Sequence, residues 1–274
     1  MAKLASYQGL NALVTGASSG IGRLLALRLA RAGARVALVA RREAELGALA
    51  DEIRNVGSEA LVLACDVSDK GQVFSAAERA LERFGTVDLL VNNAGYGHHR
   101  RFLDWDLDDM ERVMRVNYLG GLYWTKALLP QMAQRRRGWI VFMASLAGRV
   151  GVPEESAYVA SKFALVGLSE ALSIELEDDG VHVLTVCPAI VQTEFFDDEA
   201  LANMPPVSKR TMLEPEVLVD AVLKALAQGK HQITVPGRLA TAYLVKAIAP
   251  GFMRRNVKRS TIEAMAKERR RTDA

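Results

Sequence analysis

Seven short runs of Val, Leu, Ile and Ala alternate along the chain with longer stretches of helical periodicity. Such short, uniformly apolar runs are typical of strands that are buried on both faces of a parallel sheet. The alternation therefore predicts an α/β fold, with helices on both faces of the sheet. The expected strands are Ala12 to Val14, Val36 to Ala40, Ala60 to Ala64, Leu89 to Val91, Trp139 to Met143, Val181 to Val186 and Gln232 to Val235. The expected helices cover about 20–32, 42–56, 69–84, 106–135, 156–178 and 214–228.

The domain organisation follows from the absence of a linker-like segment in the first 188 residues. We therefore expect a single domain over 1–274. The chain becomes irregular in 189–213, where prolines, phenylalanines and methionines occur without a clear strand. Such a segment is more often a lid or binding loop than a linker, so we expect a substrate lid there. Residues 239–274 form a basic, amphipathic C-terminal extension.

The composition favours a globular protein with a large core. Of the 274 residues, 50% are hydrophobic and 24% charged, which argues against disorder. Two cysteines, Cys65 and Cys187, are too few to staple a fold of this size and favour a reducing cytoplasm. The first ten residues lack the pattern of a targeting segment, and Leu239 to Met253 is too short and interrupted to span a bilayer. We expect a cytoplasmic protein.

The positive charge is concentrated in the C-terminal part of the chain. Residues 230–274 contain eleven Lys or Arg and three acidic residues, although the net charge of the whole chain is only +3. From 239 onwards these bases are mixed with apolar residues, as in an amphipathic surface helix. Such a helix could dock on its own body or on a second copy, or lie on an anionic membrane. Nucleic acid is not expected, because no recognised nucleic-acid module accompanies the charge.

A glycine-rich turn, Thr15-Gly16-Ala17-Ser18-Ser19-Gly20-Ile21-Gly22, follows the first expected strand and leads into a helix. Glycines permit a tight turn and let a pyrophosphate approach the amide groups at the helix N-terminus. A purely structural turn is the alternative interpretation of this motif alone. The candidate dinucleotide contacts in it are Gly16, Ser18, Ser19, Gly20, Ile21 and Gly22.

The second expected strand ends at Ala40-Arg41-Arg42. In dinucleotide-binding folds, a carboxylate here would bind the ribose 2′-hydroxyl of NAD, whereas a cation accommodates the 2′-phosphate of NADP. Arg41 and Arg42 therefore favour NADP over NAD, although ordinary surface arginines would look the same. Two further strand ends are expected to line the same crevice, with the candidate contacts Asp66, Val67, Asn93, Ala94 and Gly95.

Tyr158 and Lys162 lie four residues apart in a helical stretch, so their side chains share one face. A free tyrosine has a pKa of about 10, and a neighbouring ammonium group lowers that pKa by stabilising the phenolate. Tyr158 could then donate and accept a proton. Ser145, at the end of the fifth expected strand, adds a hydroxyl to the same edge of the sheet.

These motifs together resemble the classical short-chain dehydrogenases/reductases. The resemblance extends over about residues 8–235 and rests on the glycine-rich turn, Asn92-Asn93-Ala94-Gly95, Asn117, Ser145, Tyr158 with Lys162, and Pro188, in the family's order and spacing. It implies a Rossmann-type doubly wound sheet of seven parallel strands in a three-layer sandwich. It also implies an NAD(P)-dependent oxidoreductase acting on a carbonyl or alcohol, and a homo-oligomer, a dimer or tetramer, built partly through the helices containing Tyr118 to Arg135 and Tyr158 to Glu177.

The resemblance assigns roles to the catalytic candidates. Tyr158 would be the acid in reduction and the base in oxidation, and Ser145 would hydrogen-bond the substrate oxygen. Lys162 would lower the pKa of Tyr158 and hold the nicotinamide ribose. Asn117 would anchor a water that links Lys162 to solvent. Beside the nicotinamide, the implied contacts are Pro188, Ile190 and Thr193.

The expected substrate wall is mostly apolar, which favours a hydrophobic ketone or secondary alcohol. Its candidates are Leu146, Val150, Val152, Ile190, Phe195, Phe196, Met204 and Met212. No metal is expected, because no acidic or cysteine spacing completes a site around His98 and His99. Two alternatives remain open: a catalytically silent nucleotide-binding regulatory or scaffold protein of the same fold, and an epimerase or dehydratase that holds its cofactor tightly.

Overall fold

The seven strands in the described part of the chain all belong to one parallel sheet. The computed structural model describes residues 3–195, 204 and 212–263. The strands are β1 Asn11–Thr15, β2 Arg35–Ala40, β3 Ala60–Ala64, β4 Leu89–Asn92, β5 Gly138–Met143, β6 Val181–Pro188 and β7 Gln232–Val235. Their order is β3-β2-β1-β4-β5-β6-β7. The chain therefore reverses its direction of travel across the sheet between β1 and β4, where the strand ends leave a crevice for a ligand.

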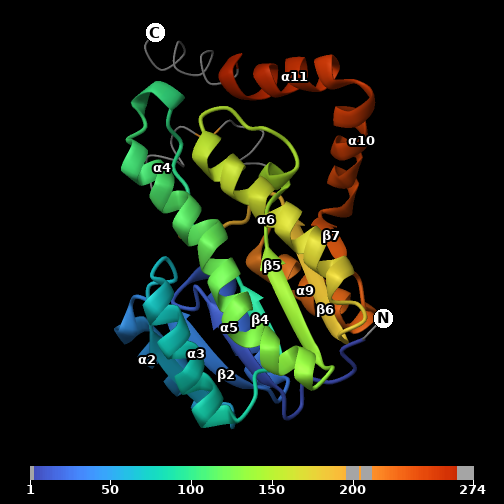
Figure 1. Ribbon diagram of the computed structural model, residues 1–274. Coiled ribbons are helices and arrows are strands. Elements are labelled where there is room, and N and C mark those ends of the chain that lie inside the picture. Colours follow the sequence, from blue (N-terminus) through green and yellow to red (C-terminus); the bar gives the residue numbers. More distant parts are fainter. Residues whose placement is uncertain (1–2, 196–203, 205–211, 264–274) are drawn as a thin grey trace.

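Helices cover both faces of this sheet (Figure 1). They are α1 Gly20–Arg31, α2 Glu43–Asn55, α3 Lys70–Phe84, α4 Leu107–Met114, α5 Gly120–Gln134, α6 Ser156–Glu175 and α9 Pro215–Gln228. The buried apolar side chains of α1, α2 and α9 belong to one hydrophobic cluster, and those of α3 and α5 belong to another, together with Leu165 and Val166 of α6. The three-layer α/β fold predicted from the sequence is confirmed.

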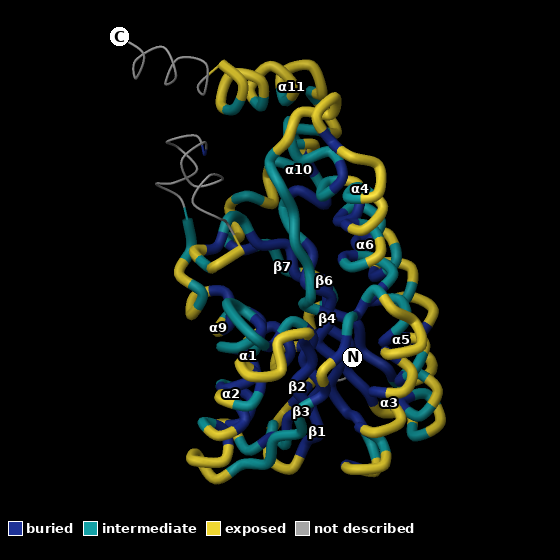
Figure 2. The backbone as a smooth tube through the Cα atoms, turned by 90° about the vertical axis from the view of Figure 1, so that its left-hand side faces the viewer, coloured by how far each residue is buried: buried dark blue, intermediate teal, exposed yellow. Residues whose placement is uncertain are grey.

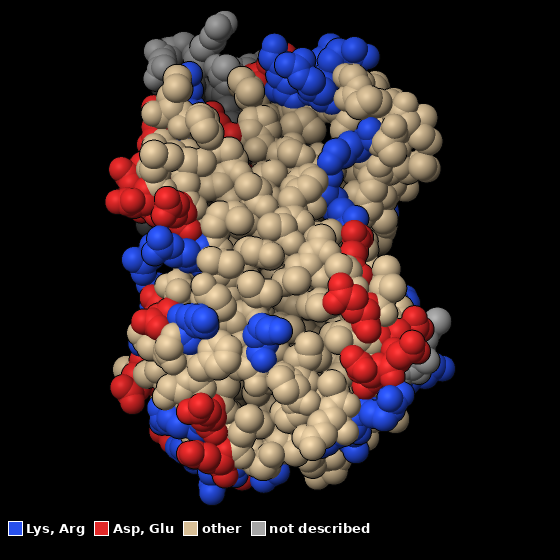
Figure 3. All heavy atoms as spheres, viewed as in Figure 1, with Lys and Arg blue, Asp and Glu red and all other residues tan. Residues whose placement is uncertain are grey.

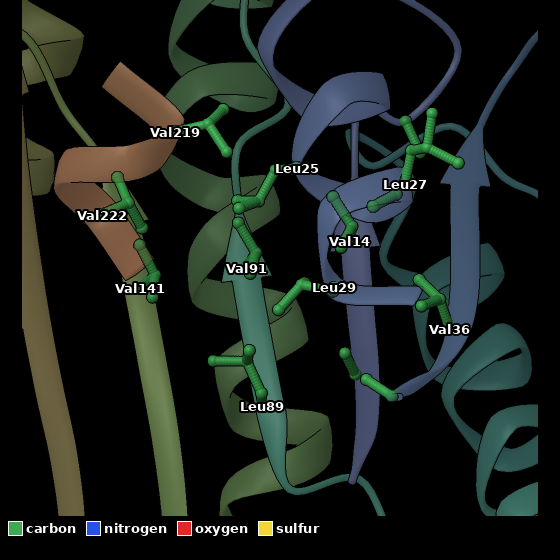
Figure 4. Close-up of a cluster of buried hydrophobic side chains, with 14 of the residues drawn as sticks. Val14, Leu25, Leu27, Leu29, Val36, Leu89, Val91, Val141, Val219 and Val222 are labelled. Carbon is green, nitrogen blue, oxygen red and sulfur yellow. The ribbon is translucent and has the colours of Figure 1, made fainter. Parts of the chain in front are cut away.

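Side-chain alternation along the strands explains the two clusters. In β1, Leu13 belongs to the cluster beneath α3, α5 and α6, while its neighbour Val14 faces Leu25 and Leu29 of α1. Figure 4 shows this second set, in which Val91 and Val141 of the neighbouring strands continue the row. The central strands β1, β4, β5 and β6 are dark blue in Figure 2 because both faces are covered. The uniformly apolar runs are thus a consequence of double-sided burial.

The expected helix over 106–135 is in fact interrupted. A π-helical turn, Arg115–Leu119, separates α4 from α5, so the prediction of one continuous helix is wrong. Such a turn accommodates an additional residue per turn while the chain continues in nearly the same direction. The apolar periodicity of the sequence therefore continues across the turn. The interruption lies at Asn117, one of the candidate site residues.

The C-terminal extension folds back over the body of the molecule. After the short turn Gly237–Ala240, α10 Thr241–Ile248 extends from the end of β7, and α11 Pro250–Lys258 crosses the upper end of the molecule (Figures 1 and 2). A second π-helical turn, Arg259–Glu263, follows. Contacts with the body are made from α10, by Tyr243 with Thr234 and by Lys246 with Arg149. The uses considered for this extension stay predictions, and 264–274 lie outside the described residues.

One described helix, α6, is long and apolar enough to cross a membrane. Core helices of soluble proteins pass the same test, and α6 packs against β6 and α4. The further observation that it carries Tyr158 and Lys162 makes it part of the site described next.

Candidate active site

Thr15 ties together the two strand ends at the reversal point. Its hydroxyl donates to the Val91 carbonyl oxygen at 3.2 Å and accepts from the backbone N–H groups of Asn93 and Ala94 at 2.9 and 3.0 Å. The Asn93 side chain donates in return to the Thr15 carbonyl oxygen at 2.9 Å. The glycine-rich turn and the Asn-Asn-Ala-Gly turn therefore form one hydrogen-bonded unit.

Two glycines of this unit have no room for a side chain. Gly16 has a φ of +68°, and a Cβ atom on it would lie 2.9 Å from the Ala94 Cα atom. A Cβ atom on Gly22 would lie 2.3 Å from the Gly16 carbonyl oxygen. No side chain at these glycines therefore covers the backbone N–H groups at the start of α1, and the helix dipole favours an anion there.

Arginines gather where β2 ends. Arg42 donates to the Ser18 hydroxyl at 2.9 Å and lies 3.6 Å from a Glu45 carboxylate oxygen. Burial alone would raise the pKa of Asp66, but hydrogen bonds from Ser68 and the charges of Arg41 and Arg112 lower it below its ordinary value. The Asp66 carboxylate is therefore ionised and positioned at this end of the crevice.

Tyr158 and Lys162 lie one turn apart on α6, as predicted, and both face the crevice. Lys162 is 4% exposed; its ammonium donates to the Met143 carbonyl oxygen at 2.8 Å and lies 5.6 Å from the centre of the Tyr158 ring. Ser145 follows β5, and its hydroxyl hydrogen-bonds with the Tyr158 side chain. The three residues meet although they come from two different elements.

The pKa values of this pair correct one prediction. Burial raises the pKa of Tyr158 well above its ordinary value, the Glu155 charge raises it further, and the hydrogen bond with Ser145 lowers it only in part. The expectation that the pKa of Tyr158 is lowered overall is wrong for this chain. Burial dominates, and it also lowers the pKa of Lys162 to about 8. Near neutrality, Tyr158 therefore holds its proton and Lys162 is mainly charged.

Asn117 positions the turn beneath this pair. Its side-chain oxygen accepts from the Tyr96 backbone N–H at 2.9 Å, and its amide nitrogen donates to the Tyr96 carbonyl oxygen and the Ser161 hydroxyl, each at 2.9 Å. A Cβ atom on Gly95 would lie 3.2 Å from the Asn117 Oδ1 atom and 3.3 Å from the Lys162 Nζ atom. The side chain of Asn117 is thus engaged by the protein itself, and the water link expected of it stays a prediction.

One cavity of about 1220 Å³ joins the glycine-rich end to the Tyr158 end. The predicted site residues that line it are Gly16, Ser18, Ser19, Gly20, Ile21, Arg41, Arg42, Asp66, Val67, Asn93, Ala94, Gly95, Ser145, Tyr158, Lys162, Pro188, Ile190 and Thr193. Gly22 and Asn117 do not line the cavity, but they contact residues that do, Gly16 and Tyr96. Of the expected apolar wall, Leu146, Val150, Val152, Ile190, Phe195 and Met204 line the cavity and Met212 does not, while Phe196 lies outside the described residues.

Some lining residues had no role in the sequence interpretation. Gly97 packs on the Tyr158 ring, where an added Cβ atom would lie 2.8 Å from the ring edge. The carboxylate of Glu155 lies 3.1 Å from His99 Nε2 inside the cavity. From the C-terminal extension, Leu239, Ala242, Met253, Val257 and Ile262 also line it. The amphipathic pattern of the extension was the one signal for its contribution; the other contacts are long-range and have no local signature.

A family model for short chain dehydrogenases matches residues 10–203, which include both motifs of the crevice. The chain belongs to the short-chain dehydrogenase/reductase family. It is 36% identical over 255 residues to a 3-ketodihydrosphingosine reductase from Bos taurus, an alignment that covers 89% of this chain and 75% of the relative.

Solved structures of the family have the same fold. A short-chain dehydrogenase/reductase from Mycobacterium marinum superposes with a TM-score of 0.77 at 32% identity, over 84% of this chain and 95% of the other. A metagenomic short-chain oxidoreductase in complex with NADP superposes with a TM-score of 0.72 at 31% identity, over 84% of this chain and 98% of the other. The protein is thus an NAD(P)-dependent oxidoreductase acting on CH–OH groups, and the predicted family and enzyme class are confirmed.

Proposed function

We propose that this short-chain dehydrogenase/reductase uses NADP(H) and reduces or forms a carbonyl group on a largely apolar substrate, with Tyr158 as the acid/base. The observation that carries the proposal is the convergence of Tyr158, Ser145 and Lys162 in the cavity that also contains the glycine-rich turn. A scaffold protein of the same fold would have no need to retain this buried trio.

The residues present fit a dinucleotide. Gly16 and Gly22 keep the start of α1 bare for a pyrophosphate, and Thr193 lies over the same turn, 3.2 Å from where a Cβ atom on Gly20 would be. Asp66 and Val67 would contact the adenine end, and Asn93 to Gly95 would form the floor. We propose Pro188, Ile190 and Thr193 for the nicotinamide end. NADPH, when bound, supplies the hydride.

The protein's own part in the reaction is proton transfer and orientation. A protonated Tyr158 is the form that can donate to a developing alkoxide, so its raised pKa suits reduction. Ser145 would hydrogen-bond the same oxygen and hold it against the phenol. Lys162 would supply a positive charge, which favours the phenolate left behind, and its contact with the Met143 carbonyl fixes its position. Asn117 would keep the turn at Gly95 in place beneath them.

The experiment compares the wild type with Tyr158→Phe in NADPH oxidation against a panel of apolar ketones. We expect the variant to fold and bind NADPH normally but to lose about 10²- to 10⁴-fold in turnover, the usual contribution of a general acid. Absorbance at the NADPH band measures the turnover, and fluorescence titration measures cofactor binding. Near-normal turnover by Tyr158→Phe would remove the tyrosine from this role. Substrate conversion without net NADPH consumption would favour an epimerase or dehydratase instead.

The preference for NADP is proposed from the arginines at the end of β2. Arg41 and Arg42 both line the cavity, and Arg42 already contacts Ser18 of the glycine-rich turn. A phosphate between these three side chains would receive charge-assisted hydrogen bonds from two guanidinium groups.

The lid, location and assembly stay proposals as well. We propose 189–213 as a substrate lid, because its described residues Ile190, Phe195 and Met204 line the cavity.

Basic side chains gather over α11 (Figure 3) beside the exposed Phe252. This combination suits contact of a cytoplasmic protein with an anionic membrane, and vesicle co-sedimentation tests that contact. We also propose a dimer or tetramer through α5 and α6, where Ile174 is 76% exposed; light scattering reports its mass.

A further inference from the structure

Two serines of α6, Ser161 and Ser169, are fully buried and share the same local bond. The Ser161 hydroxyl donates to the Tyr158 carbonyl oxygen at 2.7 Å, and the Ser169 hydroxyl donates to the Val166 carbonyl oxygen at 2.9 Å. Serine is a weaker helix former than alanine, and a hydroxyl that bonds back to its own helix does not stabilise that helix. Each oxygen can still accept from a second group, and that second partner indicates what each serine contributes.

The second partner of Ser169 lies in the sheet. The Thr185 hydroxyl, on β6, donates to Ser169 Oγ at 2.7 Å. Both residues are buried where α6 packs against β6, and neither of them lines the cavity. Ser169 therefore joins a helix to the strand on which that helix packs, which is a structural role.

The second partner of Ser161 lies beside the active site. Asn117, in the π-helical turn before α5, donates from its amide nitrogen to Ser161 Oγ at 2.9 Å. The same amide group is bonded in both directions to the backbone of Tyr96, which follows Gly95. A continuous row of hydrogen bonds therefore leads from the turn that would form the floor of the cofactor site, through Asn117 and Ser161, to the backbone of Tyr158.

The Ser161 hydroxyl also determines which way the Asn117 amide points. Because its proton is bound by the Tyr158 carbonyl oxygen, the hydroxyl oxygen can only accept, and the Asn117 group that faces it is the NH2 group. The Asn117 oxygen then lies on the side of Gly95 where Lys162 Nζ also lies. A Cβ atom on Gly95 would be 3.2 Å from that oxygen and 3.3 Å from Nζ. The amide therefore presents an acceptor, and not a donor, toward the charged lysine.

We propose that Ser161, through its bond with Asn117, is a positioning residue for Tyr158. It fixes the turn of α6 that carries Tyr158 and Lys162 against the floor of the cofactor site. The inference rests on the proposed function, in which Tyr158 is the acid, and adds a residue that lies outside the cavity. Proton transfer requires the phenol to be within hydrogen-bond reach of the substrate oxygen, so a small displacement of this turn slows the chemical step more than it weakens binding.

The test is Ser161→Ala, which removes the hydroxyl group and leaves every side chain that lines the cavity unchanged. With saturating NADPH and an apolar ketone, we expect the single-turnover rate of NADPH oxidation to fall about tenfold, because a misplacement of about 1 Å can cost about 100-fold. KM for the ketone and the affinity for NADPH should stay within about twofold, as expected when only an interaction of the transition state is lost. Stopped-flow absorbance measures the rate, and fluorescence titration measures the affinity.

The matched control is Ser169→Ala, which removes an equally buried hydroxyl with the same kind of bond from the same helix. Both variants leave one buried donor without its acceptor, so thermal unfolding should show a similar loss of stability in the two. Only Ser161→Ala should slow hydride transfer. Ser161→Thr keeps a hydroxyl that can bond to the same carbonyl oxygen, so its rate should be within about threefold of that of the wild type.

The three serine variants separate positioning from stability. A Ser161→Ala protein as fast as the wild type would overturn the proposal, and so would equal slowing by Ser169→Ala, which would indicate a general loss of stability. A folded Ser161→Thr protein that is as slow as Ser161→Ala would also contradict it, because the hydroxyl would then not be the cause of the slowing.

A spectroscopic measurement separates this inference from the proposed function. The ring-carbon NMR signal of Tyr158, in protein with isotope-labelled tyrosine rings, is assigned by its absence from Tyr158→Phe. We expect Ser161→Ala to shift this signal and Ser169→Ala to leave it unchanged. An unchanged signal in Ser161→Ala would refute the positioning of Tyr158 by Ser161, whether or not ketones are reduced. Absence of reduction by the wild type with every ketone would refute the proposed function, while the NMR comparison would still decide the role of Ser161.

Discussion

The glycine-rich end of the cavity and its C-terminal roof are built in opposite ways. At the glycine-rich end the backbone itself is closely packed: the Thr15 hydroxyl accepts from two backbone N–H groups of the neighbouring strand end, and Gly22 packs directly against the Gly16 carbonyl. The roof, α10 with α11, is attached by side chains. The Tyr243 hydroxyl lies 2.9 Å from the Thr234 hydroxyl, and Lys246 donates to the Arg149 carbonyl oxygen at 2.7 Å.

The two regions also differ in how far their residues are buried. The glycine-rich end lies at the edge of a sheet that is buried on both faces. The roof contributes Met253 and Val257 to the cavity, yet Leu244, Ile248 and Phe252 remain 62%, 74% and 52% exposed. An arrangement in which the backbone is closely packed suits an invariant ligand such as a dinucleotide. One fixed by side chains can change with the substrate while the rest of the fold stays the same.

The largest effect is expected at the glycine-rich end. Gly22→Ala would force a Cβ atom to within 2.3 Å of the Gly16 carbonyl oxygen, so the turn must shift. We expect a loss of about 1–3 kcal/mol in the free energy of unfolding, as for other overpacked sites, and loss of NADPH binding. Urea unfolding and fluorescence titration measure the two quantities.

Gly47→Ala is the matched control, because nothing lies within 4 Å of a Cβ atom at that position in α2. Alanine is the better helix former, so this variant should be up to about 1 kcal/mol more stable. If both variants behaved alike, the close packing of the glycine-rich turn would have no functional consequence.

An intermediate effect, on the affinity for NADPH, is expected from the two arginines at the end of β2. Replacing Arg41 and Arg42 together by Ala removes both cations from this part of the cavity. We expect the affinity for NADPH to fall about tenfold to a hundredfold, as when charge-assisted bonds are lost, with little change for NADH. Arg54→Ala, an exposed arginine at the end of α2, is the control. An unchanged preference in the double variant, or a wild type that prefers NADH, would contradict the assignment of these arginines.

The smallest effect is expected from the roof, and it should concern the substrate alone. A chain that ends at Gly237 lacks the five apolar residues that the described extension contributes to the cavity, together with Ser260 and Thr261. We expect kcat/KM for apolar ketones to fall about tenfold, which corresponds to about 1.4 kcal/mol, or the loss of about 55 Å² of apolar contact. The affinity for NADPH should change less than about twofold.

A chain that ends at Glu263 keeps the described part of the roof and should behave like the full-length protein. The comparison of the two truncations assigns any effect to 238–263. A parallel loss of NADPH and substrate affinity in the shorter chain would show that the two ends of the cavity are not independent.

The sequence predicted the glycine-rich end far better than the roof, for a physical reason. A buried parallel strand is marked by its own apolar residues, and residues such as Gly16 and Tyr158 carry their chemistry in local spacing. The roof depends on contacts such as Lys246 with Arg149, 97 positions apart, which leave no local pattern. Its amphipathic character was predictable, but the surface it covers was not.

The features of the site that the sequence did not predict also depend on contacts without a local sequence pattern. The π-helical turn at Asn117 leaves the apolar periodicity nearly intact, so it had no signature. The pKa of Tyr158 was expected to fall because a lysine is four residues away, but burial by the whole cavity decides its direction. The pair of His99 and Glu155 joins a loop to a distant helix start, and neither residue has a motif of its own.

Transfer of deuterium from NADPH labelled at C4 of the nicotinamide to an apolar ketone tests the central claim most directly. The account predicts that the wild type oxidises one equivalent of NADPH for each alcohol formed, with a single deuterium on the carbinol carbon of the product, detected by mass spectrometry and NMR. Alcohol formed without deuterium at that carbon, or the absence of alcohol with every ketone despite tight NADPH binding, would contradict it.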